Sequence, residues 1–375
     1  MSFFGQIADT WQALIDLIIR PPRHEYSVAR DLGARRLVVK GVLVIREDIE
    51  LMNARGHMLK CSHFQPAEEE EDETELPDEN DELLDTAGPA AWGSKFRPRA
   101  KPFPCVVFCH GNAGSRVDSL PLLPLLLPAG ISLFCFDFSG AGQSDGEFLS
   151  LGHFEKDDLK TVCEFLHENC PRVSRIGIWG HSMGASSCLL YAGNDGDRLV
   201  SAMVLDSGFS SLDAVIAETA ANAKQKLGDS IAPALKLMPD LFIPMAVSAV
   251  RRSILKQAAF DISDVDPLAK CPQLLLPVLF AHADHDDMVV PAHSERLHEA
   301  YGGSSTLVRF RGNHNSHRPD FFLTNALEFL RNILRPTDEE SPAAHLLFHN
   351  PLMTGAPRLA TPPHDCSDHH VYSHS

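Results

Sequence analysis

The strongest constraint on the fold is an alternation of short apolar runs with helical segments over residues 103–335. Helical periodicity is clear, for example, in Phe154–Asn169 and Ala185–Ala192. Residues 37–64 are also expected to form strands, with a hairpin that turns near Arg55–Gly56. Because buried strands that alternate with helices form a parallel sheet covered on both faces, the pattern predicts an α/β fold. The expected strands of the alternating region are Cys105–Cys109, Ile131–Phe136, Arg175–Trp179, Ala202–Leu205, Pro277–Ala281 and Thr306–Phe310.

The α/β domain is expected to span residues 37–335, with two segments that break the alternation. Residues 66–102 form the first, and residues 68–85 within it contain 12 acidic residues and no basic one. Like charges at that density repel one another, so this insertion is predicted to be solvated and disordered. Residues 212–262 are helical in composition and lie between two strands, which predicts a small helical cap. Beyond the domain, residues 336–375 lose periodicity and are predicted to be a flexible tail.

Residues 1–36 are predicted to form an amphipathic helix followed by a linker. Apolar residues over positions 4–19 recur at helical spacing, and two prolines then end the helix. We expect this apolar stripe to pack on the catalytic domain. The alternative is a weak peripheral contact with a membrane surface through Phe3, Phe4 and Trp11.

Charge and cysteine usage exclude several classes of protein. The chain has 50 Asp and Glu against 33 Lys and Arg, a net charge of −17, which argues against nucleic-acid binding. The nine cysteines include no C-x-x-C pair, so neither a disulfide framework nor a thiolate zinc site is expected. No run of about 18 apolar residues and no secretory signal are present, and a cytoplasmic protein is expected.

The sharpest chemical signal is Gly180-His-Ser182-Met-Gly184. It follows an apolar strand and precedes a helix of small residues, the context in which a nucleophile elbow occurs. A serine at such a tight turn needs glycines two residues to either side, so that strand and helix approach without Cβ clashes. The motif predicts Ser182 as a nucleophile and the Met183 amide as one donor of an oxyanion hole.

A second glycine-rich turn, His110-Gly111-Asn112-Ala-Gly114, directly follows the first strand of the repeat. Its position predicts that the Asn112 amide is the second oxyanion donor. A phosphate-binding turn is a weak alternative, because the patterns G-x-x-x-x-G-K-[ST] and G-x-G-x-x-G are both absent.

The serine needs a histidine base and a carboxylate that orients it. His314 lies just beyond the last expected strand and is the preferred base, with His317 as its rival. Asp286, after the preceding strand, is the preferred acid; the alternatives are Asp284 and Asp206, the latter at the end of an earlier strand. The order Ser182, Asp286, His314 is the chain order of α/β-hydrolase triads.

The segment His282-Ala-Asp284-His285-Asp286-Asp287 also has metal-ligand residue types. The elbow and the late histidine already account for a carboxylate there, and no second such cluster stands at a strand end. We therefore predict neither a metal nor a cofactor.

Taken in order, His110-Gly-Asn, Phe136-Asp-Phe-Ser-Gly140, Gly180-His-Ser-Met-Gly184, the Asp286 loop and Gly312-Asn-His314-Asn resemble the α/β-hydrolase superfamily. They look most like its serine aminopeptidase-like branch of α/β-hydrolase domain-containing proteins, which includes membrane-associated depalmitoylases. The resemblance implies an eight-stranded, mostly parallel sheet and carries over Ser182, Asp286 and His314 as the triad, with the Asn112 and Met183 amides as the oxyanion hole. The N-terminus lacks the cysteine cluster by which those depalmitoylases reach membranes.

These features together predict a serine hydrolase that cleaves a carboxylic ester or thioester with an apolar acyl group. The expected partner is a small-molecule or acylated substrate. Two other functions stay open: a serine aminopeptidase, which uses the same triad, and a non-enzymatic scaffold that keeps the fold.

Overall fold

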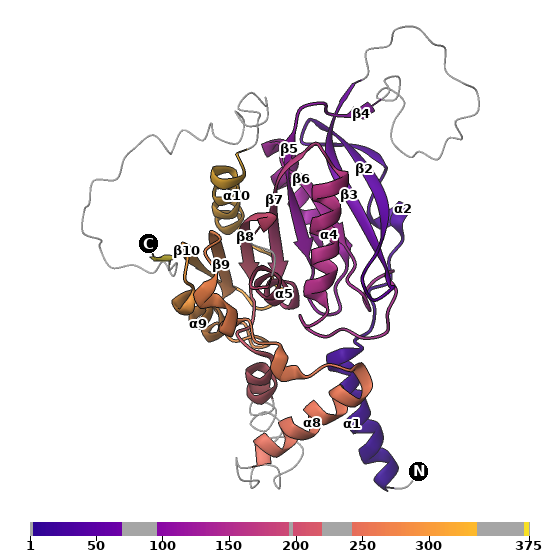
Figure 1. The fold of residues 1–375 in the computed structure, drawn as a ribbon, viewed down its shortest axis with the longest axis vertical. Helices are drawn as coiled ribbons and strands as arrows, with labels where there is room; N and C mark the ends of the chain where they lie inside the picture. The colour runs from indigo at the N-terminus through magenta and orange to yellow at the C-terminus, as the bar shows by residue number, and fades with distance from the viewer. Residues whose placement is uncertain (1–2, 70–95, 195–197, 220–241, 336–370, 375) are drawn as a thin grey trace.

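The computed structural model of the protein describes residues 3–69, 96–194, 198–219, 242–335 and 371–374. Within these residues, eleven strands form one sheet in the order β1-β2-β3-β6-β5-β7-β8-β9-β10-β11, with β4 paired to β3 (Figure 1). The strands are β1 (Arg36–Val39), β2 (Val42–Met52), β3 (Met58–Glu69), β4 (Phe96–Pro98), β5 (Phe103–Cys109), β6 (Ser132–Phe136), β7 (Val173–His181), β8 (Val200–Asp206), β9 (Val278–Ala283), β10 (Ser305–Phe310) and β11 (Val371–His374).

The central strands β6, β5, β7, β8, β9 and β10 are parallel, whereas β1 to β4 and β11 pair antiparallel. This arrangement confirms the predicted α/β fold with a mostly parallel central sheet. The expected number of eight strands was too small for the described chain, because the short strands β1, β4 and β11 add to the eight longer ones.

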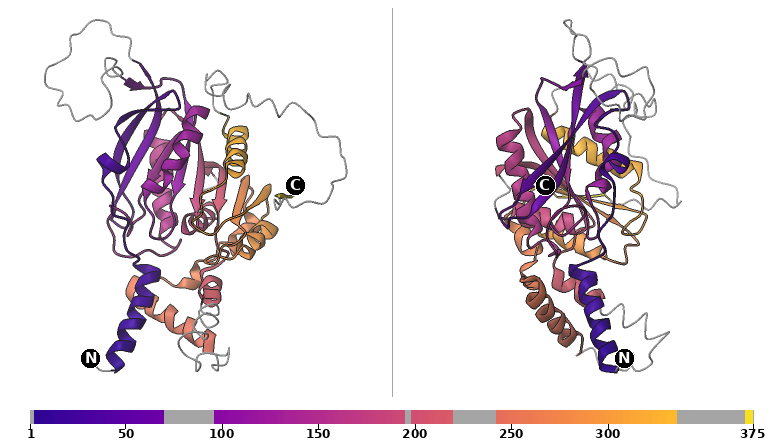
Figure 2. Two further views of the ribbon diagram at one scale, coloured as in Figure 1. Left: turned by 180° about the vertical axis from the view of Figure 1, so that it is seen from behind. Right: turned by 90° about the vertical axis from the view of Figure 1, so that its right-hand side faces the viewer.

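Helices cover both faces of the sheet, as Figures 1 and 2 show. The helices α4, α5 and α9 pack on one face, where the larger core lies, and η1, α3 and α10 pack on the other. Every residue of β5 and β6 is buried, which a strand covered on both faces requires. The bounds are α2 (Val28–Asp31), η1 (Arg116–Leu122), α3 (Leu123–Leu126), η2 (Leu127–Ala129), α4 (Glu155–Asn169), α5 (Met183–Ala192), η4 (Ile262–Asp264), η5 (Leu268–Gln273), α9 (Ala292–Ala300) and α10 (Asp320–Leu334).

Two hairpins refine the expected strands near the N-terminus. A tight turn at Lys40–Gly41, where both residues have positive φ (46° and 83°), divides the apolar run after residue 36 into β1 and β2. In the second hairpin, Glu68 pairs with Arg97 across β3 and β4. Both strands extend into the expected insertion 66–102, whose boundaries were therefore too wide; its residues 70–95 lie outside the described part of the chain.

The cap and the tail are described only in part. In the expected cap, residues 212–219 are helical and α8 spans Phe242–Ala258, whereas residues 220–241 lie outside the description. In the expected flexible tail, the described residues 371–374 instead form β11 at the edge of the sheet, beside β10. No helix among the described residues combines the length and the apolar character needed to cross a membrane.

The N-terminal helix α1 (Phe3–Ile19) lies beside α8 below the sheet in Figures 1 and 2. The indole Nε1 of Trp11 donates to Ser253 Oγ at 3.1 Å, and Gln12 Nε2 donates to Gln257 Oε1 at 2.9 Å. Ile15 and Ile19 are fully buried in the larger core, while Leu14 and Leu17 are exposed. The described turns of the helix thus pack on α8 and the larger core, whereas the side chains of Phe3 and Phe4 lie outside the description.

Truncating residues 1–20 is expected to lower the melting temperature and to increase the binding of a dye that reports exposed apolar surface. Burial of a side chain such as Ile15 or Ile19 contributes about 1.5–3 kcal/mol before entropy is subtracted. Differential scanning fluorimetry measures the first effect, and sedimentation with anionic vesicles should be the same for both proteins. Equal stability combined with lost sedimentation would instead identify α1 as a membrane anchor.

Candidate active site

Ser182 stands at the sharp turn between β7 and α5, with φ 53° and ψ −117°. A Cβ on Gly180 would lie 2.5 Å from the backbone of Ala185, and one on Gly184 would lie 2.0 Å from the Cys109 carbonyl oxygen. Neither position has room for a side chain, so both glycines are required for strand and helix to meet here. The Ser182 N–H donates to the Asp206 carbonyl oxygen at 2.8 Å, which holds the strained residue to β8.

His314 bridges Ser182 and Asp286. Its Nδ1 lies 2.6 Å from Asp286 Oδ2, and its Nε2 lies 2.9 Å from Ser182 Oγ. A carboxylate only accepts hydrogen bonds, so Nδ1 carries the proton and Nε2 is left as the acceptor of the Ser182 hydroxyl. All three side chains are largely buried, each being less than a tenth exposed. The structure thus brings the three predicted residues together in the tautomer that lets histidine act as a base.

The Asp286 carboxylate is oriented by groups other than His314. Its Oδ1 accepts the N–H groups of Met288 (3.0 Å) and Val289 (2.9 Å), and His282 Nε2 lies 3.3 Å from Oδ2. Burial alone would raise the pKa of Asp286. The hydrogen bonds from His282, His314 and the Val289 N–H together lower it by more than burial raises it, so the pKa falls well below its usual range. Asp286 therefore stays ionised at neutral pH and can stabilise an imidazolium on His314.

The rival residues occupy other positions. Asp284 forms an ion pair with Arg309 at 2.7 Å, Asp206 pairs with Arg318, and His317 is exposed. None of these three makes the hydrogen bond to Ser182 or Asp286 that His314 makes.

The two predicted oxyanion donors lie close to Ser182: Met183 follows it in the chain, and Asn112 lines the same cavity. Met183 is the first residue of α5, where N–H groups have no partner within the helix. Asn112 lies in the turn that Gly111 and Gly114 close, with the Gly114 N–H donating to Gly111 O at 3.0 Å. His110 anchors this turn: its Nδ1 donates to Gly111 O (2.8 Å), while its Nε2 accepts the N–H of Phe138 (3.1 Å).

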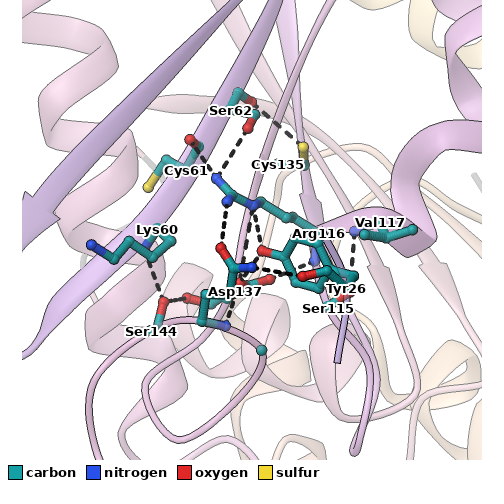
Figure 3. Close-up of polar contacts among 12 residues, drawn as sticks. Tyr26, Lys60, Cys61, Ser62, Ser115, Arg116, Val117, Cys135, Asp137 and Ser144 are labelled. Carbon is teal, nitrogen blue, oxygen red and sulfur yellow. Dashed lines mark hydrogen bonds and ion pairs between the residues drawn. The ribbon is translucent and has the colours of Figure 1, made fainter. Parts of the chain in front are cut away.

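A buried polar network holds the chain just after this turn (Figure 3). The Tyr26 hydroxyl donates to Asp137 Oδ2 and accepts from Arg116 Nε, both at 2.6 Å, while the Arg116 N–H donates to Asp137 Oδ1 at 2.7 Å. Burial and the neighbouring Asp137 carboxylate raise the pKa of Tyr26 above its usual value, which keeps the hydroxyl protonated. The network joins the linker after α1, the start of η1 and the residue after β6. It therefore holds the chain that directly follows the Asn112 turn.

Arg318 is a positioning residue that the sequence did not reveal. Its Nε and one NH group donate to Asp206 at 2.6 and 3.0 Å, and its guanidinium also donates to the carbonyl oxygens of His314 (2.9 Å) and Ser316 (2.6 Å). Because the Asp206 carbonyl oxygen also accepts the Ser182 N–H, this bidentate pair ties the loop that carries His314 to the strand beside Ser182. His181 Nε2 also donates to the His314 carbonyl oxygen, at 3.3 Å, and so helps to hold the loop that carries His314. Burial lowers the pKa of His181.

Replacing Arg318 with methionine should leave the Asp206 carboxylate buried without its counter-ion, although the Ser207 hydroxyl still donates to it at 3.0 Å. We expect the free energy of unfolding at pH 7 to fall by about 3–5 kcal/mol. Displacement of the histidine loop should lower kcat/KM by about 10²-fold. Urea denaturation and ester hydrolysis measure the two effects. The double variant Arg318→Met with Asp206→Asn removes both charges and is expected to lose less stability.

The pH dependence of the stability lost in Arg318→Met distinguishes loss of the ion pair with Asp206 from loss of side-chain packing. Burial raises the pKa of Asp206, whereas the charge of Arg318 and the neighbouring hydrogen bonds lower it by more. The pKa of Asp206 is therefore below its ordinary value in the native protein. In the wild-type protein, the stability that the ionised Asp206 contributes is therefore fully present above the ordinary pKa of aspartate. It is lost as the pH falls through the lower pKa that Asp206 has in the folded protein. In Arg318→Met the main influence that lowers the pKa of Asp206 is lost, while burial, His181 and the Ser207 hydroxyl remain. The pKa of Asp206 therefore rises, and the stability deficit should shrink from pH 7 to pH 5. An equal deficit at both pH values would contradict this role.

Nothing in the described chain assembles a metal site: no group of three or more His, Cys, Asp or Glu side chains is arranged to hold an ion there. His282, which the sequence placed in a metal-like segment, is buried, with its Nδ1 accepting from Ser294 Oγ (2.6 Å) and its Nε2 donating to Val289 O (2.8 Å). The eight cysteines that the structure describes are free thiols, and burial raises the pKa of Cys105 and Cys135 to about 12.

Comparison with known proteins gives the class to which this fold belongs. The profile of the family described as alpha/beta hydrolase fold matches residues 104–234. An esterase from Pyrococcus furiosus superposes with a TM-score of 0.55 at 18% identity, covering 84% of this chain and 98% of the esterase. An acylaminoacyl peptidase from Pyrococcus horikoshii gives a TM-score of 0.50 at 14% identity, covering 81% and 44% of the two chains. The fold is therefore that of the α/β hydrolases.

Relatives by sequence narrow the identity no further. The uncharacterized protein YqkD of Bacillus subtilis is 31% identical over 204 residues, which cover 54% of this chain and 61% of YqkD. The uncharacterized protein YfhR of Escherichia coli K12 is 28% identical over 106 residues, covering 28% and 37% of the two chains. The chain thus spans less than two thirds of the length of these relatives.

Proposed function

We propose that this protein is a serine hydrolase that cleaves a carboxylic ester or thioester. The observation that carries the proposal is His314, which lies within hydrogen-bond distance of both Ser182 Oγ (2.9 Å) and Asp286 Oδ2 (2.6 Å). A serine hydroxyl is a weak nucleophile until a base accepts its proton, and this arrangement supplies the base together with the carboxylate that orients it.

The proposed reaction proceeds in two acyl transfers. Ser182 Oγ forms a bond to the acyl carbon while its proton passes to His314 Nε2, and the charge that develops on the carbonyl oxygen is stabilised by the Asn112 and Met183 amides. Removal of one such donor typically costs about 3–4 kcal/mol. The bond to the alcohol or thiol then breaks, and His314 protonates the leaving group. Water, deprotonated by His314, attacks the acyl-enzyme, which releases the carboxylic acid and restores Ser182.

Two features of the site support acyl hydrolysis. Asp286, with its lowered pKa, is ionised when His314 becomes an imidazolium, so the charge pair forms without a further proton transfer. The site also opens to a cavity of about 610 Å³, large enough for a small acylated substrate. Apolar residues of the expected cap would also suit an acyl pocket by their composition, but their side chains lie outside the described part of the structure: Leu237, Met238, Leu241, Phe242 and Ile243.

A fluorophosphonate probe followed by a substrate panel tests the proposal. We expect the probe to label the full-length protein, and p-nitrophenyl esters or acyl thioesters to be hydrolysed in preference to aminoacyl amides. Labelling combined with cleavage of aminoacyl amides alone would assign the protein as a serine aminopeptidase. Absence of labelling and of all hydrolysis would contradict an enzyme and favour a scaffold.

A further inference from the structure

We propose that the acyl group of the substrate binds in a side slot between η1 and α10, formed by Phe108, Leu122, Trp179 and Leu323. This inference rests on the proposed function, because it takes Ser182 as the attacking residue. Beyond the proposed function, the slot gives the position of the acyl group and the residues that limit its length. The slot belongs to the sheet face opposite the larger core, and the described part of the cap contributes no residue to it.

The slot is the apolar part of a cavity that Ser182 also lines. Gly111, Asn112 and His314 line the same cavity, so the proposed nucleophile, its base and one proposed oxyanion donor share it with the slot. A Cβ on Gly111 would lie 3.1 Å from the His181 ring and 3.4 Å from Ser182 Cβ. The chain therefore passes close beside the nucleophile at a position where a larger residue would crowd Ser182.

Two aromatic side chains form the floor of the side slot. Phe108 on β5 and Trp179 on β7 are register partners in adjacent parallel strands, and they lie on the face that α3 and α10 cover. They are only 6% and 2% exposed, and both line the cavity. Trp179 precedes Ser182 by three residues, and both line the same cavity.

The walls of the side slot come from the elements on either side of this floor. On one side η1 supplies Pro121 and Leu122, and on the other α10 supplies the half-buried Leu323. Leu122 is 5% exposed and belongs to the same apolar cluster as the two aromatic residues. Aromatic and aliphatic walls with few polar groups are the usual lining of a pocket that holds an apolar ligand.

The charges around the slot favour an uncharged acyl group. The buried carboxylate that lines the cavity, Asp206, is neutralised by its bidentate pair with Arg318. The other lining carboxylate, Asp118, is exposed at the rim, where it accepts the Ser115 N–H at 3.1 Å. A charged acyl group would lose its hydration inside the slot without finding a buried counter-ion, whereas the transfer of an aliphatic or aryl acyl group out of water is favourable. The structure thus assigns esters or thioesters of neutral, apolar carboxylic acids.

Changing the size of Leu323 tests the slot. Leu323→Trp narrows it, and the ratio of kcat/KM for p-nitrophenyl hexanoate to that for p-nitrophenyl acetate is expected to fall by about tenfold or more. Leu323→Ala widens it and should shift the preference toward longer chains. The matched control is Leu255→Trp, which adds the same side chain to an exposed position on α8 and should leave the ratio at the wild-type value.

The outcomes separate this inference from the proposed function. If the wild-type protein hydrolyses esters but both Leu323 variants keep its hexanoate-to-acetate ratio, the slot does not hold the acyl group. If Leu255→Trp changes the ratio and the Leu323 variants do not, the acyl group binds on the cap side. Wild-type protein that hydrolyses no ester and takes no probe overturns the proposed function itself. Should Leu323→Trp fail to fold, Leu323→Ala still predicts a shift of opposite sign.

Discussion

Replacing Ser182 with alanine is expected to abolish fluorophosphonate labelling and to lower kcat for ester hydrolysis by about 10⁶-fold, the loss typical of removing the nucleophile of a triad. The fold should survive, because the hydroxyl that is removed bonds to His314 rather than to the core. The matched control is Ser174→Ala, an exposed serine at the other end of the same strand, which should label like wild type. Labelling that persists in Ser182→Ala would refute the assignment.

Asp286→Asn is expected to lower kcat by about 10⁴-fold while leaving the fold intact, because an amide no longer holds His314 in the tautomer with a free Nε2. Asp284→Asn is the matched control: its carboxylate pairs with Arg309, so activity should change little. Asp206→Asn should fall between the two, because it loosens Arg318 without touching His314. Steady-state hydrolysis of a p-nitrophenyl ester measures all three. A more severe loss in Asp206→Asn than in Asp286→Asn would place the acid on β8.

The parts of the site that sequence could predict are those with local signals. The elbow has a strand before it, a helix after it and glycines at Gly180 and Gly184, and each of those glycines proves to stand where a Cβ would clash with backbone. The expected strands agree with β5 to β10 to within a few residues, since fully buried strands are recognised from continuous apolar runs. The choice of His314 over His317 followed from distance to the strand end, which the geometry supports.

The parts that sequence could not predict depend on contacts between residues far apart in the chain. Arg318 reaches Asp206 across 112 positions, and the Tyr26 hydroxyl reaches Asp137 across 111. No spacing rule marks such pairs, because they arise only when helices and strands are packed. The side slot is similar, since Leu122 and Leu323 become neighbours of one cavity only through the placement of η1 and α10 on one face.

The predicted strand boundaries were wrong where backbone pairing extends or divides a strand in a way that composition does not show. The acidic composition after Glu68 suggested a loop, yet Glu69 still pairs with Phe96 because antiparallel partners satisfy each other's backbone groups. The run from Leu37 contains no strong turn signal other than Gly41, so the division into β1 and β2 was not expected.

The central claim, that Ser182 forms a covalent acyl-enzyme with His314 as its base, is tested most directly by trapping that intermediate. The protein is mixed with excess p-nitrophenyl butyrate, quenched in acid within the first turnover, digested and analysed by mass spectrometry. The account predicts a butyryl group on the peptide that contains Ser182, a burst of p-nitrophenol of about one equivalent per active site, and no adduct in Ser182→Ala. A butyryl group on another residue, or turnover without any adduct or burst in the wild-type protein and unchanged in Ser182→Ala, would contradict it.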